Sequence, residues 1–399
     1  MEIRKNTDTR IMAGELWKKF LLSAVAEDML MGEVADHLYL SDMDFKSLSQ
    51  KGEDYLISSV TETAFGDLVD EAAYNLSERA GDYRPWSDLS RYMGEEEIGD
   101  ALFDRISSRI TRHSPEEIMN NPYFRHVRVE GKTMAHHLAL TVNDYLPGEF
   151  VQTYHEGFSE EDPFRAQTAG FFDGKVTFPV LLENGEVWMS LVLSEIESMR
   201  EPIRRARGRV ITYGLGLGYY AFMASEKNEV ESVTVVELNP HVIALFKEKI
   251  LPWFPHGDKI HIVSGDALSY VDAQEDGVFD YGFSDFWAGI HDGLLLYMDF
   301  MPRTARFRKT LHDYWIENYV AEYYFRPALM EMMAGEVLGR TVRIPGYPRK
   351  ERKVMDRFLR FLAREPGVLE RGQDMMALLE TKNLVSMMRR FAVKEGNHN

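Results

Sequence analysis

The chain has 399 residues, of which 45% are hydrophobic and 12% aromatic, and it carries 46 Lys and Arg against 64 Asp and Glu. This length predicts two domains, or one large domain with additions, and the composition is sufficient for a packed core. The net charge of −18 disfavours nucleic acid and anionic membranes as general partners, because both require a basic surface. The absence of cysteine excludes disulfides, thiolate nucleophiles and cysteine-ligated metal or iron–sulfur sites.

No segment near the N-terminus has the pattern of a membrane span or a secretory leader. The longest early apolar run covers residues 20–26 and is interrupted by Ser23. It is too short to cross a bilayer, and no small-residue cleavage pattern follows it. We therefore expect a soluble, cytoplasmic protein without a membrane partner.

Residues 1–168 are predicted to form a mainly helical N-terminal domain, because Leu, Met and Ala recur at helical spacing between acidic faces. One helix start is well marked by Ser114 as N-cap and Pro115 at the first helical position, followed by acidic residues. Asn121-Pro122 predicts the end of this helix.

Residues 169–206 are predicted to form a β-hairpin and a linking helix. The apolar runs 175–182 and 187–193 flank Asn184-Gly185, a strong signal for a two-residue hairpin turn. Residues 195–206 then have a helical pattern.

Residues 207–320 alternate strand and helix, which predicts βαβ units and a parallel sheet. The expected strands cover 209–213, 232–237, 259–264 and 279–284, and the helices between them include 219–225 and 241–249. A short fifth strand is predicted at 314–317. Residues 321–399 are predicted to be a helical C-terminal region.

A glycine-rich turn, Gly214-Leu215-Gly216-Leu217-Gly218, joins the first of these strands to its helix. Such a turn lets the backbone approach a ligand closely at a helix N-terminus. Counted from Gly216, it matches the dinucleotide pattern G-x-G-x-x-G/A; counted from Gly214, it is G-x-G-x-G. Both patterns require an acidic residue at the end of the second strand to bind ribose hydroxyls, and Glu237 occupies that position.

The third strand separates these two interpretations, because it ends in Ser264-Gly265-Asp266-Ala267. The order GLGLG, VVELNP, GDA and FDYGFSD resembles the class I S-adenosylmethionine-dependent methyltransferase superfamily over residues 175–320. Within that superfamily it is similar to the spermidine-synthase-like branch, in which a β-hairpin domain precedes the nucleotide-binding domain. The resemblance implies an α/β fold with a Rossmann-like parallel-sheet domain.

The resemblance also implies S-adenosylmethionine as cofactor and methyl transfer to a small-molecule acceptor, or to a protein. Glu237 would hold the ribose and Asp266 the adenine amine, while Asp285 would face both the methionine part of the cofactor and the acceptor. The implied cofactor-binding residues are Tyr213, Gly214, Gly216, Gly218, Glu237, Leu238, Asp266, Ala267 and Asp285.

Two candidate catalytic residues follow the fourth strand. The carboxylate of Asp285 would be attracted to a sulfonium and could accept a proton from an acceptor. His291 and Asp292 could form an acid/base pair, although a helix-capping role for Asp292 fits equally well. Phe286 and Trp287 are expected to wall the adenine or the acceptor, or to lie in the core.

Other functions stay open. Aminopropyltransferases carry a D-x-x-D-P-type motif where this chain has residues 284–287, and a Tyr-His-Glu motif where it has 194–197; its Tyr154-His155-Glu156 lies about sixty residues before the glycine turn. Aminopropyl transfer from decarboxylated S-adenosylmethionine is the first alternative. A nicotinamide-dependent oxidoreductase and a non-catalytic cofactor-binding scaffold are the others, and a homo-oligomer is compatible with all of them.

Two further patterns are weaker. His136, His137 and His155 lack the spacing of metal ligands, so no metal site is predicted. Lys353, Arg357, Arg360 and Arg364 recur at steps of 4, 3 and 4 and form a basic stripe on one helix face, preceded by Arg349, Lys350 and Arg352. The stripe indicates either a solvated face or contact with an acidic partner, a subunit or RNA.

Overall fold

The computed structural model describes residues 1–30, 89–153, 158–164, 168–340 and 347–396. The chain divides into two units, each made of segments that are distant in the sequence. The first unit contains residues 1–112, 148–171 and 318–391, and the second contains 113–147, 172–317 and 392–399. Within the described residues, no helix is both long and apolar enough to cross a membrane.

The second unit is built on a five-stranded parallel sheet with the order β11-β10-β9-β12-β13. This confirms the predicted α/β fold, because the order 3-2-1-4-5 along the chain is that of Rossmann-like sheets. The strands are β9 (Gly208–Tyr213), β10 (Val230–Glu237), β11 (Ile260–Ser264), β12 (Tyr281–Ser284) and β13 (Leu311–Tyr314).

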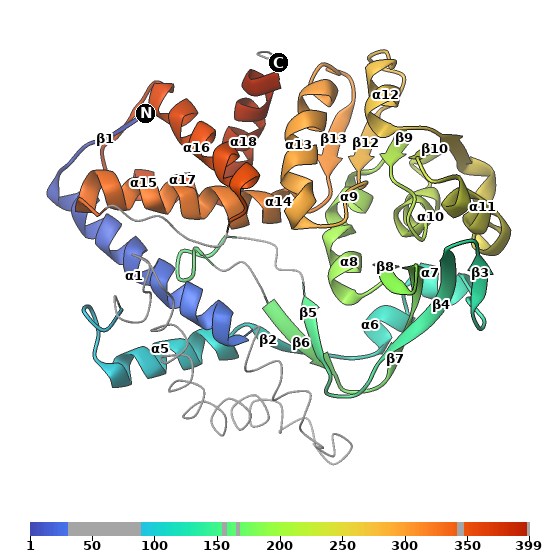
Figure 1. The fold of residues 1–399 in the computed structure, drawn as a ribbon, viewed down its shortest axis with the longest axis horizontal. Coiled ribbons are helices and arrows are strands. Elements are labelled where there is room, and N and C mark those ends of the chain that lie inside the picture. The colour runs from blue at the N-terminus through green and yellow to red at the C-terminus, as the bar shows by residue number, and fades with distance from the viewer. Residues whose placement is uncertain (31–88, 154–157, 165–167, 341–346, 397–399) are drawn as a thin grey trace. The chain divides into compact units, whose positions relative to one another are not determined.

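Helices cover both faces of this sheet. The ring of Tyr213 contacts Tyr270 and Phe300, which places α12 (Ala267–Asp272) and α13 (Ile290–Thr304) on one face (Figure 1). Phe283 points to the other face and stacks on Tyr220 of α10 (Tyr219–Ser225). The remaining connections are α11 (Pro240–Lys249) and short 3₁₀ turns at Leu251–Trp253 and Gly257–Lys259.

The fifth strand lies three residues before its predicted position at 314–317. Two polar side chains inside β13 interrupt the apolar pattern by which a buried strand is predicted. His312 pairs with Ser284 at 2.8 Å (Nε2 to Oγ), and the carboxylate of Asp313 accepts hydrogen bonds from Arg205 (2.8 Å) and from the hydroxyl of Tyr281. Because both side chains are buried and hydrogen-bonded, they occupy a core strand despite their polarity.

A four-stranded antiparallel sheet, ordered β3-β4-β7-β8, also belongs to the second unit. The predicted hairpin is present between β7 (Val176–Glu183) and β8 (Glu186–Ser190), with positive φ at both turn residues, Asn184 and Gly185. β3 (Thr133–Ala135) and β4 (Leu138–Tyr145) extend this sheet from the region predicted to be mainly helical. Two short helices, α8 (Leu193–Ser198) and α9 (Arg200–Arg205), link the sheet to β9.

The helix that was expected to end at Asn121-Pro122 is shorter than predicted. α6 (Glu116–Met119) stops before this pair, which instead begins α7 (Pro122–His126). The side chain of Asn121 accepts a hydrogen bond from the N–H of Tyr123 (3.0 Å), and Pro122 occupies the first helical position. A pair that is typical of a helix end serves here as a helix start.

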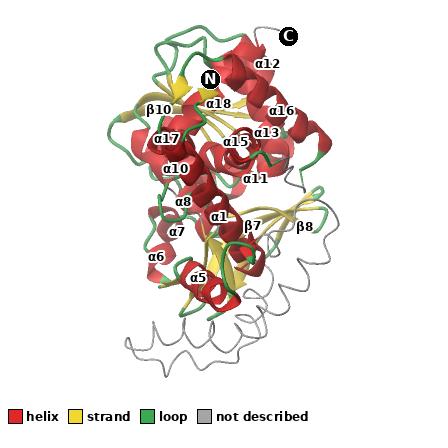
Figure 2. Cartoon of the chain, turned by 90° about the vertical axis from the view of Figure 1, so that its left-hand side faces the viewer, coloured by secondary structure: helices red, strands yellow, loops and turns green. Residues whose placement is uncertain are grey.

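The first unit is mainly helical (Figure 2). The N-terminal helix α1 (Thr7–Met29) packs on α5 (Glu95–Ser107), α15 (Arg326–Leu338) and α17 (Gly372–Leu379). α16 (Arg349–Arg364) and α18 (Thr381–Gly396) complete the helical layer through contacts of Phe358 and Phe361 with Phe391. The other elements are β1 (Glu2–Ile3), β2 (Ile110–His113), β5 (Phe150–Thr153), β6 (Thr168–Phe172), α14 (Glu317–Val320), a π-helix at Ala321–Phe325 and β14 (Val368–Leu369).

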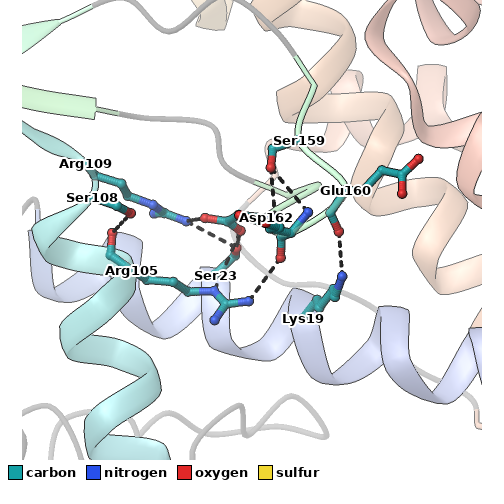
Figure 3. Close-up of polar contacts among 9 residues, drawn as sticks. Lys19, Ser23, Arg105, Ser108, Arg109, Ser159, Glu160 and Asp162 are labelled. Atoms are coloured by element: carbon teal, nitrogen blue, oxygen red, sulfur yellow. Dashed lines mark hydrogen bonds and ion pairs between the residues drawn. The ribbon is translucent and has the colours of Figure 1, made fainter.

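A buried ion pair joins three segments of this unit (Figure 3). The guanidinium of Arg109, fully buried, donates to Asp162 (2.7 Å) and to the hydroxyl of Ser23 on α1 (3.1 Å). Burial alone would raise the pKa of Asp162, but the charge of Arg109 and the hydrogen bonds from Ser23 and Arg109 hold that pKa below its usual value. Asp162 is therefore ionised and neutralises Arg109.

Replacing Asp162 with asparagine is expected to lower the free energy of unfolding by about 3–5 kcal/mol, because it leaves Arg109 buried without a counter-charge. Urea unfolding at pH 7 measures this loss. The matched control is Glu201→Gln, which removes the partner of the exposed Arg204 and should cost about 0–1 kcal/mol. Equal losses in the two variants would show that burial of Arg109 has no energetic consequence.

Candidate functional site

A cavity of about 480 Å³ lies at the carboxyl ends of the parallel strands, entirely within the second unit. This is where open α/β sheets bind their ligands. Its walls come from the loops after β9, β10, β11 and β12, and from β8 and α8. The predicted site residues that line it are Gly214, Gly216, Glu237, Leu238, Asp266, Ala267 and Asp285.

The glycine turn adopts a conformation that side chains would prevent. Gly214, Gly216 and Gly218 all have positive φ, at +100°, +54° and +74°. A Cβ atom at Gly214 would lie 1.7 Å from the carbonyl oxygen of Asp285. The glycine at 214 therefore lets the turn pack against the end of β12, and both Gly214 and Gly216 line the cavity.

Gly218 does not line the cavity, although the sequence predicts it to bind the cofactor. It is the N-cap of α10, and a Cβ atom there would lie 2.3 Å from Cε2 of Phe246. Close packing of α10 on α11 therefore explains this glycine.

Glu237 ends β10 and is fixed by two backbone groups. Its carboxylate accepts hydrogen bonds from the N–H of Leu215 (3.0 Å) in the glycine turn and from the N–H of Asn239 (2.7 Å). Although only 8% exposed, it lines the cavity together with the exposed Leu238. A carboxylate held in this way is pre-oriented to accept further hydrogen bonds from ligand hydroxyls.

Asp266 caps a helix and also lines the cavity. One carboxylate oxygen accepts a hydrogen bond from the N–H of Ser269 (2.7 Å), so Asp266 is the N-cap of α12. It also lines the cavity next to Ala267. The cap therefore fixes the carboxyl group at the cavity wall.

Asp285 follows β12 and lines the cavity together with a second carboxyl group, that of Glu195. Burial raises the pKa of Asp285 to about 7. Burial, and then the charge of Asp285, raises the pKa of Glu195 on α8 to about 8. Two carboxyl groups that titrate near neutrality in one cavity are characteristic of sites that bind cations or transfer protons.

Glu195 is the site residue that the sequence analysis missed. In the sequence, residues 194–197 stand out only by their difference from a family motif. The only available signal for this site residue was an acidic residue in the segment that links the hairpin to β9. The sequence does not show whether the side chain of Glu195 points into the cavity, because this depends on how α8 packs.

Tyr213 does not line the cavity. It is almost fully buried on the opposite side of the sheet, and its hydroxyl donates to Gln274 (3.3 Å). Side chains alternate along a strand, so the preceding residue, Thr212, lines the cavity instead.

His291 also lies outside the cavity, exposed in the first turn of α13. Its neighbour Asp292 accepts hydrogen bonds from the N–H groups of Ala288 and Gly289, both at 2.9 Å. Asp292 is thus a helix cap that also lines the cavity, whereas His291 does not.

Aromatic side chains form the remaining wall, as expected for Phe286 and Trp287. Trp188 of β8 and Trp315 after β13 line the same cavity. The indole N–H of Trp315 donates to Ser198 (2.9 Å), whereas that of Trp287 is buried without a hydrogen-bond partner. The cavity thus combines carboxyl groups with large apolar surfaces.

The histidines considered as metal ligands do not form a metal site in the described residues. The rings of His136 and His241 lie 4.0 Å apart, and His137 pairs with Glu183 at 3.2 Å. His155 and the segment Tyr154-His155-Glu156 lie outside the described residues. Among those described, no group of three or more His, Asp or Glu is placed to hold a metal ion.

Comparison with known proteins gives similarity to solved structures only. No protein-family model and no curated protein sequence matches the chain. A spermidine synthase from Thermotoga maritima is 16% identical over 37% of this chain and 54% of its own, with a TM-score of 0.26. The PRMT1 enzyme-prozyme complex of Trypanosoma brucei is 15% identical over 29% and 36%, with a TM-score of 0.23. MNMC2 from Aquifex aeolicus is 15% identical over 52% and 82%, with a TM-score of 0.25.

The chain thus spans about half the length of the spermidine synthase and about a third of the PRMT1 chain. At these identities and TM-scores, the strand order of the parallel sheet remains the basis of the fold assignment.

Proposed function

We propose that the second unit binds S-adenosylmethionine in the cavity and transfers its methyl group to a small-molecule acceptor. The observation that carries this proposal is the convergence of the glycine turn, Glu237, Asp266 and Asp285 on one cavity at the strand ends. The acceptor could also be a protein side chain that reaches the cavity.

The donor half of the proposed site consists of Gly214, Gly216, Glu237 and Asp266. The turn gives the ligand access to backbone groups, and Glu237 would accept hydrogen bonds from the ribose hydroxyls. Asp266 would accept a hydrogen bond from the adenine amine. These residues fit a nucleoside ligand because both carboxyl groups are already fixed by backbone N–H groups before any ligand binds.

The acceptor half consists of Asp285, Glu195 and the tryptophans. A bound sulfonium supplies an electrophilic methyl group, so the protein has to position the acceptor and exclude water. Asp285 would take up the proton that the acceptor loses, and its pKa of about 7 suits a general base at neutral pH.

Calorimetric titration with S-adenosylmethionine, S-adenosylhomocysteine, decarboxylated S-adenosylmethionine, methylthioadenosine and NAD tests the proposal. Micromolar binding of the first two, with weak binding of the decarboxylated form, is the expected result. Binding of NAD alone would contradict the role of Asp266 and favour an oxidoreductase. Binding of none of them would contradict the proposal and favour a scaffold.

Replacing Glu237 with glutamine is expected to weaken S-adenosylmethionine binding about 10- to 100-fold, the equivalent of one charged hydrogen bond of about 1.5–3 kcal/mol. The same calorimetric titration measures this change. Glu231→Gln is the matched control, because Glu231 is an exposed residue at the other end of β10. Unchanged affinity in the Glu237 variant would contradict the ribose role.

Aminopropyl transfer is a second candidate, favoured by the pairing of Glu195 with Asp285. One carboxylate would hold the protonated amine of a diamine acceptor, while the other takes the proton from the amine that attacks. Tighter binding of decarboxylated S-adenosylmethionine and methylthioadenosine than of the parent cofactor would favour this reaction over methyl transfer.

A further inference from the structure

The outward face of α16 in the first unit carries an unusual concentration of positive charge. Six cations, here called the cationic row, share this face: Arg349, Lys350, Lys353, Arg357, Arg360 and Arg364. At 100° per residue, the six fall within one arc of about 100°, and no other residue of the helix falls inside that arc. Five of them are exposed and Arg357 is half-buried.

The opposite face of α16 is fixed in the core of the unit. Val354, Met355, Phe358, Phe361 and Leu362 are buried, and the ring of Phe358 contacts Phe325 and Phe391. The cationic row is therefore held at the surface on a rigid element about 24 Å long, at 1.5 Å per residue.

Carboxylates do not neutralise most of the row, although the chain has 64 of them. Among the described residues, none lies within ion-pair distance of Arg349, Lys350, Lys353, Arg360 or Arg364. The nearby Asp356 pairs with Arg352, which lies outside the arc and also pairs with Glu331. Some other exposed arginines, among them Arg204, Arg209 and Arg371, do pair with a carboxylate.

The position of these charges is not explained by helix stability. Arg349 and Lys350 occupy the first turn of α16, where the helix dipole favours negative charge. Glu351 in the same turn supplies one negative charge, but the two cations outnumber it and add to the positive field of the helix N-terminus. Such an arrangement is expected where the field itself has a use, the attraction of an anionic partner.

The composition of this face distinguishes between anionic partners. Protein interfaces have an apolar or aromatic centre, but no large hydrophobic side chain of α16 is exposed. An amphipathic membrane helix inserts its apolar face, and that face of α16 is buried in the core. Interfaces with nucleic acid are much more positively charged and rely on phosphate contacts that carry no sequence information.

We propose that the cationic row of α16 binds the phosphate backbone of a nucleic acid, without base recognition. Four of the six residues are arginines, whose planar guanidinium groups bind phosphate oxygens in a bidentate manner. The net charge of −18 disfavours general binding to nucleic acid, but salt screens charges farther than about 8–10 Å from the row. The contact is therefore local to α16.

Fluorescence anisotropy of the full chain with a labelled 20-nucleotide single-stranded RNA of mixed sequence tests this proposal. If the five exposed cations of the row neutralise five phosphates, the logarithm of the binding constant should fall with the logarithm of salt concentration with a slope of about −3.5. The triple variant Lys353→Gln/Arg360→Gln/Arg364→Gln should bind about 100-fold more weakly at 0.1 M salt, with a slope shallower by about 2. Because these side chains are exposed, its circular dichroism should match that of the unmodified chain.

The matched control is Arg128→Gln/Lys132→Gln/Lys247→Gln, which removes three exposed cations of the second unit and changes the net charge equally. Its RNA affinity should be unchanged. Equal losses in both triple variants, or no RNA binding at 50 mM salt, would overturn the proposal. So would binding of a glutamate-rich helical peptide, or of vesicles containing 30% phosphatidylserine, in the absence of RNA binding.

Discussion

Replacing Gly214 with alanine is expected to abolish measurable binding of S-adenosylmethionine and to lower the free energy of unfolding by about 2–6 kcal/mol. The new Cβ atom would lie 1.7 Å from the carbonyl oxygen of Asp285, and the residue would have to keep φ at +100°. The Cβ atom is fixed to the backbone of residue 214, and the oxygen belongs to the backbone of Asp285. No side-chain rotation can therefore relieve the clash. The ends of β9 and β12 must separate, and this displaces the turn and Asp285 together.

Gly265→Ala is the matched control for this prediction. Gly265 lines the same cavity, but a Cβ atom there has no neighbour within 4 Å, and its φ is not in the left-handed region. Urea unfolding and calorimetric titration of both variants separate the two cases. If Gly214→Ala bound the donor as well as Gly265→Ala does, the turn would not be the donor-binding element.

Much of the parallel sheet could be predicted because its signals are local. Glycine turns, β-branched runs such as residues 233–236 and the helices between them define βαβ units within short windows of sequence. The site residues Glu237, Asp266 and Asp285 follow from the same signals, since parallel strands bring their carboxyl ends to one edge. The prediction of these three as cavity-lining residues depended on the positions of strand ends alone.

The residues that could not be predicted depend on tertiary packing. Glu195 reaches the cavity only because α8 packs against it, and no periodic pattern records this contact. Tyr213 was predicted to bind the cofactor but does not line the cavity. A shift of one residue along a strand moves a side chain to the other face of the sheet, so the preceding residue lines the cavity instead. β13 was misplaced because the core satisfies His312 and Asp313 with hydrogen bonds from distant residues.

Asp285→Asn is expected to lower turnover by about 10²- to 10⁴-fold, the usual contribution of a general base. Glu195→Gln should lower turnover less, because Glu195 is not the proposed base. It contributes to the negative charge of the site and to the binding of the acceptor. In the unmodified chain, kcat/KM should rise with pH through two ionisations near 7 and 8, which belong to the carboxyl pair. Glu195→Gln should remove one of them, and Asp285→Asn should lower the pKa of Glu195 because the neighbouring charge is gone.

The carboxyl groups of Asp285 and Glu195 should also affect how the stability of the ligand-free chain depends on pH, which can be measured without a substrate. Both pKa values are raised in the folded chain, so the native state binds more protons than the unfolded state between about pH 4 and pH 8. Stability therefore falls as the pH rises through this range, and the midpoint of thermal unfolding of the ligand-free chain should be lower at pH 8.5 than at pH 6. Glu195→Gln should flatten this dependence, whereas Glu231→Gln, which changes an exposed carboxylate, should leave it intact. A midpoint that rises from pH 6 to pH 8.5 in the unmodified chain would show that the two carboxyl groups are not destabilised by burial, and Asp285 would then lack the pKa that its proposed role requires.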